Sequence, residues 1–280
     1  MTVKEKAFAK LNLTLEIGEK RPDGYHDLRS VMTCCSLHDT VTVHSAEDIT
    51  MTCDDSSLSC DKSNLCVKAA EVFFADTAIR GGCAIALHKV IPMQAGLGGG
   101  SADAAAVLRA LRRLYARELS DEALEKMAEK LGSDVPFCVR SRTALCEGRG
   151  EKLTPAGRLP RLWYVIVKPP AAYATGAMYA ALDRCTAQRE RTTDELLEAI
   201  RSGKRKKICA AVQNDFHLAL PEDSPVPAIR GKLTEMGAGA AIMSGSGSAV
   251  FGIYDNRYKA RCAAMLLEEQ GYRTFCAAGV

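Results

Sequence analysis

The N-terminal segment of the chain alternates apolar and polar residues. Every odd position from Ala9 to Ile17 is apolar, and the positions between them are polar. A period of two residues is typical of a β-strand that buries one of its faces. We therefore predict a strand over residues 7–17. On periodicity alone, the simplest interpretation is that its polar face, which carries Lys10 and Asn12, is solvated.

Further β-patterned runs and amphipathic helical patterns follow in the first half of the chain. Strands are predicted near residues 29–35, 40–44, 49–53 and 82–89. Helices are predicted over residues 64–75 and 101–115, and another between an N-cap at Ser120 and a stop at Gly132. The first half is therefore expected to be rich in strands before it becomes helical.

The second half has a more regular order of elements. Strands are predicted over residues 162–168, on both sides of the segment MSGSGS, and over residues 274–278. Helices are predicted over residues 175–182, 193–200 and 257–270. If the extra helices are ignored, the order is β-α-β-β-α-β, the split βαβ plan. Residues 155–160 form the expected boundary between a domain 1–156 and a domain 157–280.

Composition narrows the class of protein. The 280 residues are 47% hydrophobic, which is enough for one large core or two modest ones. With 37 basic and 34 acidic side chains the formal charge is +3, so no general affinity for polyanions is expected. No signal peptide and no run of about 18 apolar residues occurs, and we expect a cytoplasmic protein. The twelve cysteines form no CxxC pair, which favours reduced thiols over disulfides or a zinc site.

The segment PMQAGLGGGSADAA carries the clearest chemical signal. Four of the five positions from Gly96 to Gly100 are glycine, and they stand between a predicted strand and a predicted helix. Glycine allows backbone to approach a ligand closely, and a helix N-terminus offers free N–H groups to an anion. The loop lacks the GK[ST] ending of a Walker A motif, and Ser101 occupies the last glycine of the dinucleotide pattern GxGxxG. We interpret it as a different kind of phosphate loop, in preference to a flexible turn.

Asp134, in the segment GSDVP, is ambiguous by itself. It follows a predicted helix end and precedes a predicted strand, where short polar residues often close a turn.

Taken together, these segments resemble the GHMP kinases, the superfamily of galactokinase and of homoserine, mevalonate and phosphomevalonate kinases. PMQAGLGGGSADAA is similar to their central ATP-binding motif, AFAKLNLTLEI to their N-terminal motif, and MSGSGSAVFGIY to their C-terminal glycine motif. The resemblance implies an α+β, two-domain GHMP kinase fold. Its N-terminal domain would be ribosomal-S5-domain-2-like, and its C-terminal domain a ferredoxin-like split βαβ domain.

Three further segments resemble one branch of that superfamily. They are RPDGYHDLRSVM, LGSDVPFCV and QNDF. This branch phosphorylates the 2-hydroxyl of a cytidine diphosphate-linked polyol in the non-mevalonate route to isopentenyl diphosphate. The resemblance therefore implies an ATP-dependent phosphotransferase, with Mg²⁺ bound to the ATP.

The resemblance also implies roles for individual residues. Asp134 would be the base that accepts the hydroxyl proton, and Lys10 would orient that hydroxyl and stabilise the carboxylate. An ammonium within about 4–6 Å lowers a carboxylate pKa by roughly 1–3 units, which would keep the base ionised. Ser101 is a candidate ligand of Mg²⁺, with an N-cap role as the alternative. The residues implied in ATP binding are Pro92, Met93, Gln94, Ala95, Gly96, Leu97, Gly98, Gly99, Gly100, Ser101 and Ala102, with Asn64 and Lys89 on the adenine side.

The acceptor site is implied in the same way. Tyr25 would stack on cytosine, His26 would read its polar edge, and Tyr179 would supply a second aromatic ring. Asn12 and Thr175 would bind the diphosphate or the polyol. The ATP loop departs from the family pattern at Gln94, where a small residue is usual.

Three other functions are weighed against this one. A mevalonate or homoserine type of GHMP kinase has an acceptor without a base, which does not account for Tyr25 and His26. A catalytically silent nucleotide-binding member is disfavoured because Lys10 and Asp134 are present. A nucleic-acid-binding module would need aromatic pairs on its strands, and the chain lacks them. The expected partners are therefore the polyol and ATP, without nucleic acid or membrane, in a monomer or homodimer.

Overall fold

The computed structural model describes all 280 residues and divides them into two compact units. Unit 1 consists of residues 1–10, 38–93 and 98–141, and unit 2 of residues 11–37, 94–97 and 142–280. Each unit is assembled from several segments of the chain. The linear boundary expected near residue 156 stays a prediction.

The chain forms twelve strands, nine α-helices and one 3₁₀ helix. The strands are β1 (Thr2–Asn12), β2 (Thr14–Lys20), β3 (His26–Ala46), β4 (Thr50–Cys53), β5 (Gly82–His88), β6 (Ala144–Gly148), β7 (Lys152–Pro155), β8 (Trp163–Lys168), β9 (Gln213–Asn214), β10 (Ala240–Met243), β11 (Val250–Tyr254) and β12 (Arg273–Ala278). The helices are α1 (Leu65–Thr77), α2 (Gly99–Tyr115), α3 (Asp121–Glu129), α4 (Val135–Arg140), α5 (Thr175–Asp183), α6 (Thr193–Ser202), α7 (Arg205–Ala210), the 3₁₀ helix η1 (Asp215–Ala219), α8 (Val226–Glu235) and α9 (Arg257–Glu269).

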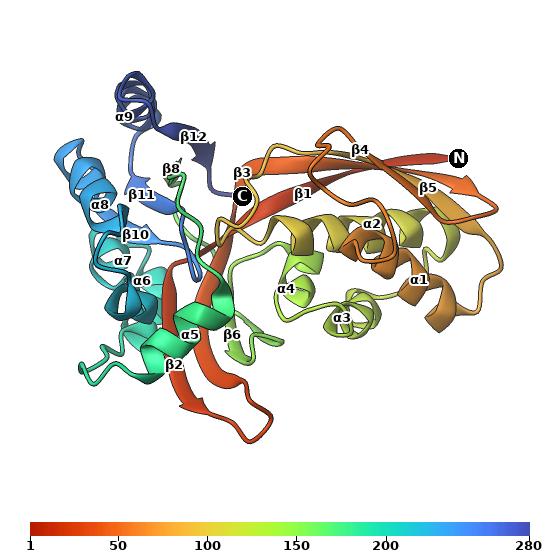
Figure 1. Cartoon of the computed structure of the whole chain (residues 1–280), viewed down its shortest axis with the longest axis horizontal. Coiled ribbons are helices and arrows are strands. Elements are labelled where there is room, and N and C mark those ends of the chain that lie inside the picture. The colour runs from red at the N-terminus through yellow and green to blue at the C-terminus, as the bar shows by residue number, and fades with distance from the viewer. The chain divides into compact units, whose positions relative to one another are not determined.

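Unit 1 packs helices against a sheet. The end of β3 pairs antiparallel with β5, and β4 pairs parallel with β5. Helices α1, α2, α3 and α4 gather on one side of these strands (Figure 1). Alanine, the best helix former, dominates the start of α2, and its small side chains allow neighbouring elements to approach closely. Nearly every residue from Ala102 to Leu111 is therefore buried.

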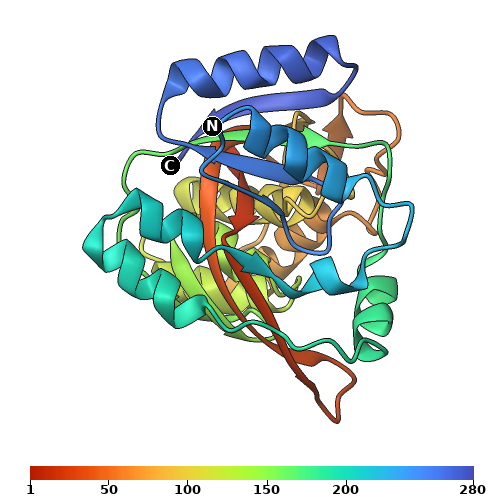
Figure 2. The same ribbon diagram turned by 90° about the vertical axis from the view of Figure 1, so that its left-hand side faces the viewer.

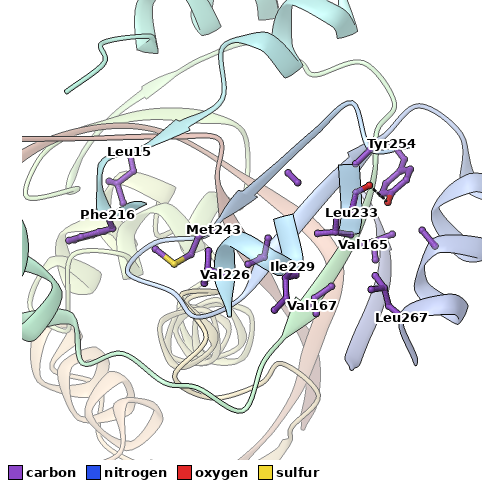
Figure 3. Packing of buried hydrophobic residues seen from close by; sticks show 14 of the residues in the cluster. Leu15, Val165, Val167, Phe216, Val226, Ile229, Leu233, Met243, Tyr254 and Leu267 are labelled. Carbon is purple, nitrogen blue, oxygen red and sulfur yellow. Dashed lines mark hydrogen bonds between the residues drawn. The ribbon is translucent and has the colours of Figure 1, made fainter. Parts of the chain in front are cut away.

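Unit 2 contains the predicted split βαβ plan. Its antiparallel four-stranded sheet has the order β10-β11-β8-β12, with Val165 opposite Gly252 and Cys276. Helices α8 and α9 place apolar side chains on one face of this sheet, and α9 runs beside β12 at the top of Figure 2. The core there joins Val167, Leu233 and Leu267, and the Tyr254 hydroxyl donates to the Leu233 carbonyl at 3.3 Å (Figure 3).

Several local predictions differ from the structure. The strand predicted over residues 7–17 is two strands, since β1 ends at Asn12 and β2 begins at Thr14. Residues 26–46 form one long strand instead of two short ones. The run after Asp134 is the helix α4 and not a strand, because Pro136 near its start fixes a helical φ and needs no N–H partner. The polar face of the first strand is not solvated, since Lys10 is 5% and Asn12 1% exposed.

All twelve cysteines are free, as the sequence predicts. Burial raises the pKa of Cys35 to about 12 and that of Cys83 to about 11, so these thiols stay protonated at neutral pH. No helix is both long and apolar enough to cross a bilayer.

Candidate active site

Lys10 and Asp134 form an ion pair in unit 1. The Lys10 Nζ lies 3.3 Å from the Asp134 Oδ2, with the lysine side chain 6% and the aspartate side chain 32% exposed. Asp134 is the N-cap residue of α4, but its side chain makes no capping hydrogen bond. A partly exposed carboxylate beside a buried ammonium can accept a proton from a ligand, so the predicted pair is brought together.

Gly98 brings the start of α2 into contact with the side chain of Lys10. It is the N-cap residue of α2 with φ +66°, and a Cβ there would lie 2.8 Å from the Lys10 Cγ. Both the positive φ and this close approach require glycine. The Ala102 N–H bonds to the Gly98 carbonyl, which leaves the N–H groups of the preceding positions without an intrahelical acceptor. The start of α2 thus has the geometry of an anion site next to the Lys10–Asp134 pair.

The helix begins two residues earlier than predicted, because Gly99 and Gly100 form its first turn. Ser101 follows them inside that turn, so its alternative interpretation as the N-cap is wrong. Its hydroxyl remains a candidate ligand for a phosphate-bound cation.

Residues 94–97 of the loop belong to unit 2 and are anchored there to the C-terminal glycine motif. The Ser244 hydroxyl donates to the Gly96 carbonyl at 2.9 Å, and the Ala249 N–H donates to the Ala95 carbonyl at 3.1 Å. A Cβ on Gly96, with φ +74°, would lie 2.0 Å from the Ser244 carbonyl oxygen. Two motifs about 150 residues apart in sequence therefore share one hydrogen-bonded structure.

Gln94, the residue at which the loop departs from the family pattern, has a left-handed backbone conformation. Its φ is +51° and its side chain is exposed. This left-handed conformation is one that glycine adopts without steric cost, so Gln94 is a sterically unfavourable residue at this position.

Lys89 lies in a buried cluster with two aspartates of unit 1. Its Nζ lies 2.5 Å from the Asp39 Oδ2 and 2.8 Å from the Asp103 Oδ2. Burial raises the pKa of Asp103 to about 7, the charge of Lys89 opposes that shift, and Asp39 adds to it. A Cβ on Gly99 would lie 3.3 Å from the Lys89 Nζ. The cluster therefore supports the first turn of α2, and an adenine-side role for Lys89 stays a prediction.

Asn64 is the N-cap residue of α1. Its Oδ1 accepts from the Cys66 N–H at 2.9 Å, and its Nδ2 donates to the Ser59 carbonyl at 2.6 Å. Both ends of the amide thus have structural partners, and its predicted role at adenine is untested.

An aromatic group in unit 2 contains His26 and Tyr179. Their rings stack with centroids 4.8 Å apart and an interplanar angle of 15°. The His26 Nε2 lies 2.7 Å from the Asp183 Oδ1. Tyr25 is 54% exposed, and the Arg149 guanidinium lies 4.9 Å from its ring centroid. The structure thus joins His26 to Tyr179, while the ring of Tyr25 remains accessible on the hairpin.

The other two predicted acceptor residues also have partners in unit 2. The Asn12 Nδ2 donates to the Ser30 hydroxyl at 2.8 Å, and the Thr175 hydroxyl lies 3.0 Å from that of Ser246. Asn12 is held in a buried hydrogen-bond network, whereas Thr175 begins α5 at the surface.

Several residues of these groups are missing from the sequence-based prediction. Asp183 could have been found, because it follows Tyr179 by one helical turn of α5 and so shares its face. Asp39 carries no local signal, since Lys89 is far away in sequence. Ser244 lies in the C-terminal glycine motif, but that motif does not reveal its bond to Gly96.

The start of α2 offers a hydroxyl that could contact a nucleotide-bound cation. No group of three or more His, Cys, Asp or Glu side chains is arranged to hold a metal. Mg²⁺ commonly keeps water and phosphate ligands and takes only one or two from protein. The glycine-lined start of α2, with the Ser101 hydroxyl in its first turn, fits such a phosphate-bound ion.

Family models match both halves of the chain. The model described as "GHMP kinases N terminal domain" matches residues 64–142, and "GHMP kinases C terminal" matches residues 196–272.

Named relatives match nearly the whole chain. Two proteins named 4-diphosphocytidyl-2-C-methyl-D-erythritol kinase are similar: that of Exiguobacterium sibiricum is 39% identical over 99% of this chain and 96% of its own. That of Caldicellulosiruptor saccharolyticus is 37% identical over 92% and 90%. A crystal structure of 4-(cytidine 5'-diphospho)-2C-methyl-D-erythritol kinase superposes with a TM-score of 0.84 at 32% identity, covering 99% of both chains. The L. major mevalonate kinase shares the fold, with a TM-score of 0.74 at 16% identity over 100% of this chain and 96% of its own.

Proposed function

Because this chain belongs to the GHMP kinase family, we propose that it transfers the γ-phosphate of ATP to the 2-hydroxyl of 4-diphosphocytidyl-2-C-methyl-D-erythritol. It would thereby act in the non-mevalonate pathway of isopentenyl diphosphate biosynthesis. The observation that carries the proposal is the Lys10–Asp134 pair at 3.3 Å, next to the free N–H groups at the start of α2. The names of the similar proteins support 4-diphosphocytidyl-2-C-methyl-D-erythritol as the acceptor.

Asp134 would accept the proton of the attacking hydroxyl. Its carboxylate makes no capping hydrogen bond and is partly exposed, so one oxygen can face a ligand while the other contacts Lys10. The ammonium of Lys10 contacts this carboxylate and can also donate a hydrogen bond to the same hydroxyl. This arrangement deprotonates the hydroxyl as it attacks and keeps the nucleophile aligned.

The glycine loop would supply charge stabilisation. Phosphoryl transfer needs mainly alignment and neutralisation of phosphate charge, and N–H groups at the start of α2 point where an anion is favoured. Gly98 holds that turn against the stem of Lys10, which keeps the ammonium close to the phosphate-binding N–H groups. Mg²⁺ would arrive with ATP and neutralise phosphate charge, with the Ser101 hydroxyl as its candidate protein ligand.

His26 would recognise the edge of cytosine. The Asp183 Oδ1 accepts a hydrogen bond from the His26 Nε2, which favours the tautomer with its proton on that nitrogen. The Nδ1 is then an acceptor, which complements the amino group that cytosine carries. Stacking on Tyr179 fixes the orientation of the imidazole, and the exposed ring of Tyr25 offers a face for the base.

The decisive experiment compares acceptors. The purified protein with Mg-ATP is expected to phosphorylate the cytidine diphosphate-linked polyol and to leave free methylerythritol unchanged. Equal turnover of an acceptor without cytosine would refute the assignment of His26 and Tyr25. Preferred turnover of mevalonate or homoserine would instead favour another GHMP kinase activity.

A second experiment tests the base. Asp134→Asn should lower kcat by about 10²–10⁴-fold, the usual contribution of a general base, while ATP still binds. The matched control is Asp76→Asn, which removes a surface ion pair with Lys130 in the same unit. Wild-type turnover by the Asp134 variant would mean that the base lies elsewhere.

We also propose that the enzyme acts in the cytoplasm, where ATP is available, as a monomer or homodimer. Sedimentation velocity of the purified chain distinguishes the two states.

A further inference from the structure

A cavity lies in unit 2, at the ends of β8 and α9. Its volume is about 510 Å³, and its lining includes Arg161 and Trp163 beside β8 and Arg257 and Arg261 of α9. None of its lining residues belongs to the candidate active site. A volume in the range of roughly 300–1,000 Å³ is typical of pockets for small molecules.

The three arginines of this cavity have no carboxylate partner. Elsewhere, arginines such as Arg29 and Arg140 bond to two acidic side chains each. The one carboxylate in the lining, Asp255, lies 3.8 Å from the Lys259 Nζ. Because guanidinium groups stay charged at all physiological pH values, the cavity carries a positive charge that its own side chains do not balance.

Trp163 holds two of these arginines close to its ring. The guanidinium carbons of Arg161 and Arg257 each lie 5.4 Å from a centroid of the indole. Cation–π attraction orients a guanidinium without using its N–H donors, so those donors stay available to an anion. The ring of Tyr258, a residue that is 76% exposed, adds apolar surface to the same lining.

We propose that this cavity binds a small organic phosphate, whose phosphate group contacts the arginines and whose organic part contacts the aromatic rings. Planar guanidinium groups match the geometry of phosphate oxygens, and a phosphate monoester carries about −1.5 to −2 charges at neutral pH. The negative charge of one such phosphate group would offset the net positive charge of the three arginines and Asp255. The volume exceeds what a phosphate alone would fill, which favours a ligand with an apolar or aromatic portion.

The chain contains its own reporter for this site. Trp163 is the only tryptophan among eight tyrosines, so fluorescence excited selectively at tryptophan reports on this cavity. Titration with phenyl phosphate should give a saturable change of that fluorescence. Inorganic phosphate should bind at least about tenfold more weakly, because it lacks the ring that contacts Trp163 and Tyr258. No saturable change, or equal affinity for both probes, would overturn the proposal.

Variants test whether the arginines hold the ligand. Arg257→Ala and Arg161→Ala should each weaken the binding of phenyl phosphate by about tenfold or more. Arg158→Ala is the matched control, because this exposed arginine precedes β8 but does not line the cavity. Equal affinity of all three variants and the wild type would refute the site. Kinase activity of Arg257→Ala should stay at the wild-type level, so a failure of this proposal is distinguishable from a failure of the proposed function.

Discussion

The substitution Gly98→Ala tests whether the start of α2 positions Lys10. The added Cβ would lie 2.8 Å from the Lys10 Cγ, whereas carbon atoms pack best at about 3.5–4.0 Å. The lysine stem must therefore shift by about 1 Å, and a misplacement of that size can lower a rate about 10²-fold. Such a loss equals about 2.7 kcal/mol of transition-state stabilisation.

The same substitution should also lower stability. Gly98 has φ +66°, and a side chain in the left-handed conformation costs about 1–2 kcal/mol. We expect kcat to fall about 10²-fold in a steady-state assay with Mg-ATP and the cytidine diphosphate-linked polyol. Urea unfolding should show a loss of at least about 1 kcal/mol in the free energy of unfolding.

Gly231→Ala is the matched control outside the site. Gly231 lies inside the helix α8, and a Cβ there would meet no atom within 4 Å. This variant should keep the Lys10–Asp134 pair and lose far less kcat than Gly98→Ala. Equal losses in the two variants, or wild-type kcat in Gly98→Ala, would refute the argument that Gly98 positions Lys10.

The remaining predictions concern residues around the site and in the core. Lys89→Met should lower the free energy of unfolding by about 3–5 kcal/mol, because it leaves two buried carboxylates without a cation; a loss under 1 kcal/mol in urea would contradict this. Asp183→Ala should raise KM for the polyol about tenfold because His26 loses its hydrogen-bond acceptor, with KM for ATP unchanged; equal rises in both KM values would argue against a role at cytosine. Burial lowers the pKa of His217 from 6.5 to about 3, so the folded state keeps it neutral while the unfolded state binds a proton below about pH 6.5. Its contribution to stability is present above that pH and decreases by about 2 kcal/mol from about pH 7.5 to about pH 5, a decrease that His217→Gln should remove from urea unfolding curves.

Local patterns in the sequence determined much of what the structure contains. The order of strands and helices in the C-terminal sheet follows from the periods of apolar residues, because each strand or helix must bury one face. The glycines of residues 96–100 predicted an anion site, since only glycine combines a positive φ with close approach of other atoms. The predicted pairing of Lys10 with Asp134 followed from resemblance to a family and agrees with their distance of 3.3 Å.

Tertiary packing decided the rest. Alternation shows which face of a strand is apolar, but not what covers the other face, so the burial of Lys10 and Asn12 could not be predicted from periodicity. The partners of Lys89 and His26 are brought to them by folding. No local pattern marks Asp39, which is 50 residues from Lys89, and the helical spacing of Asp183 from Tyr179 does not reveal that it bonds to His26, 157 residues away. The sequence by itself thus determined which segments could bind phosphate and carry the chemistry. Only the tertiary structure decided which side chains support them, because a buried charge takes its partner from whatever segment packs against it.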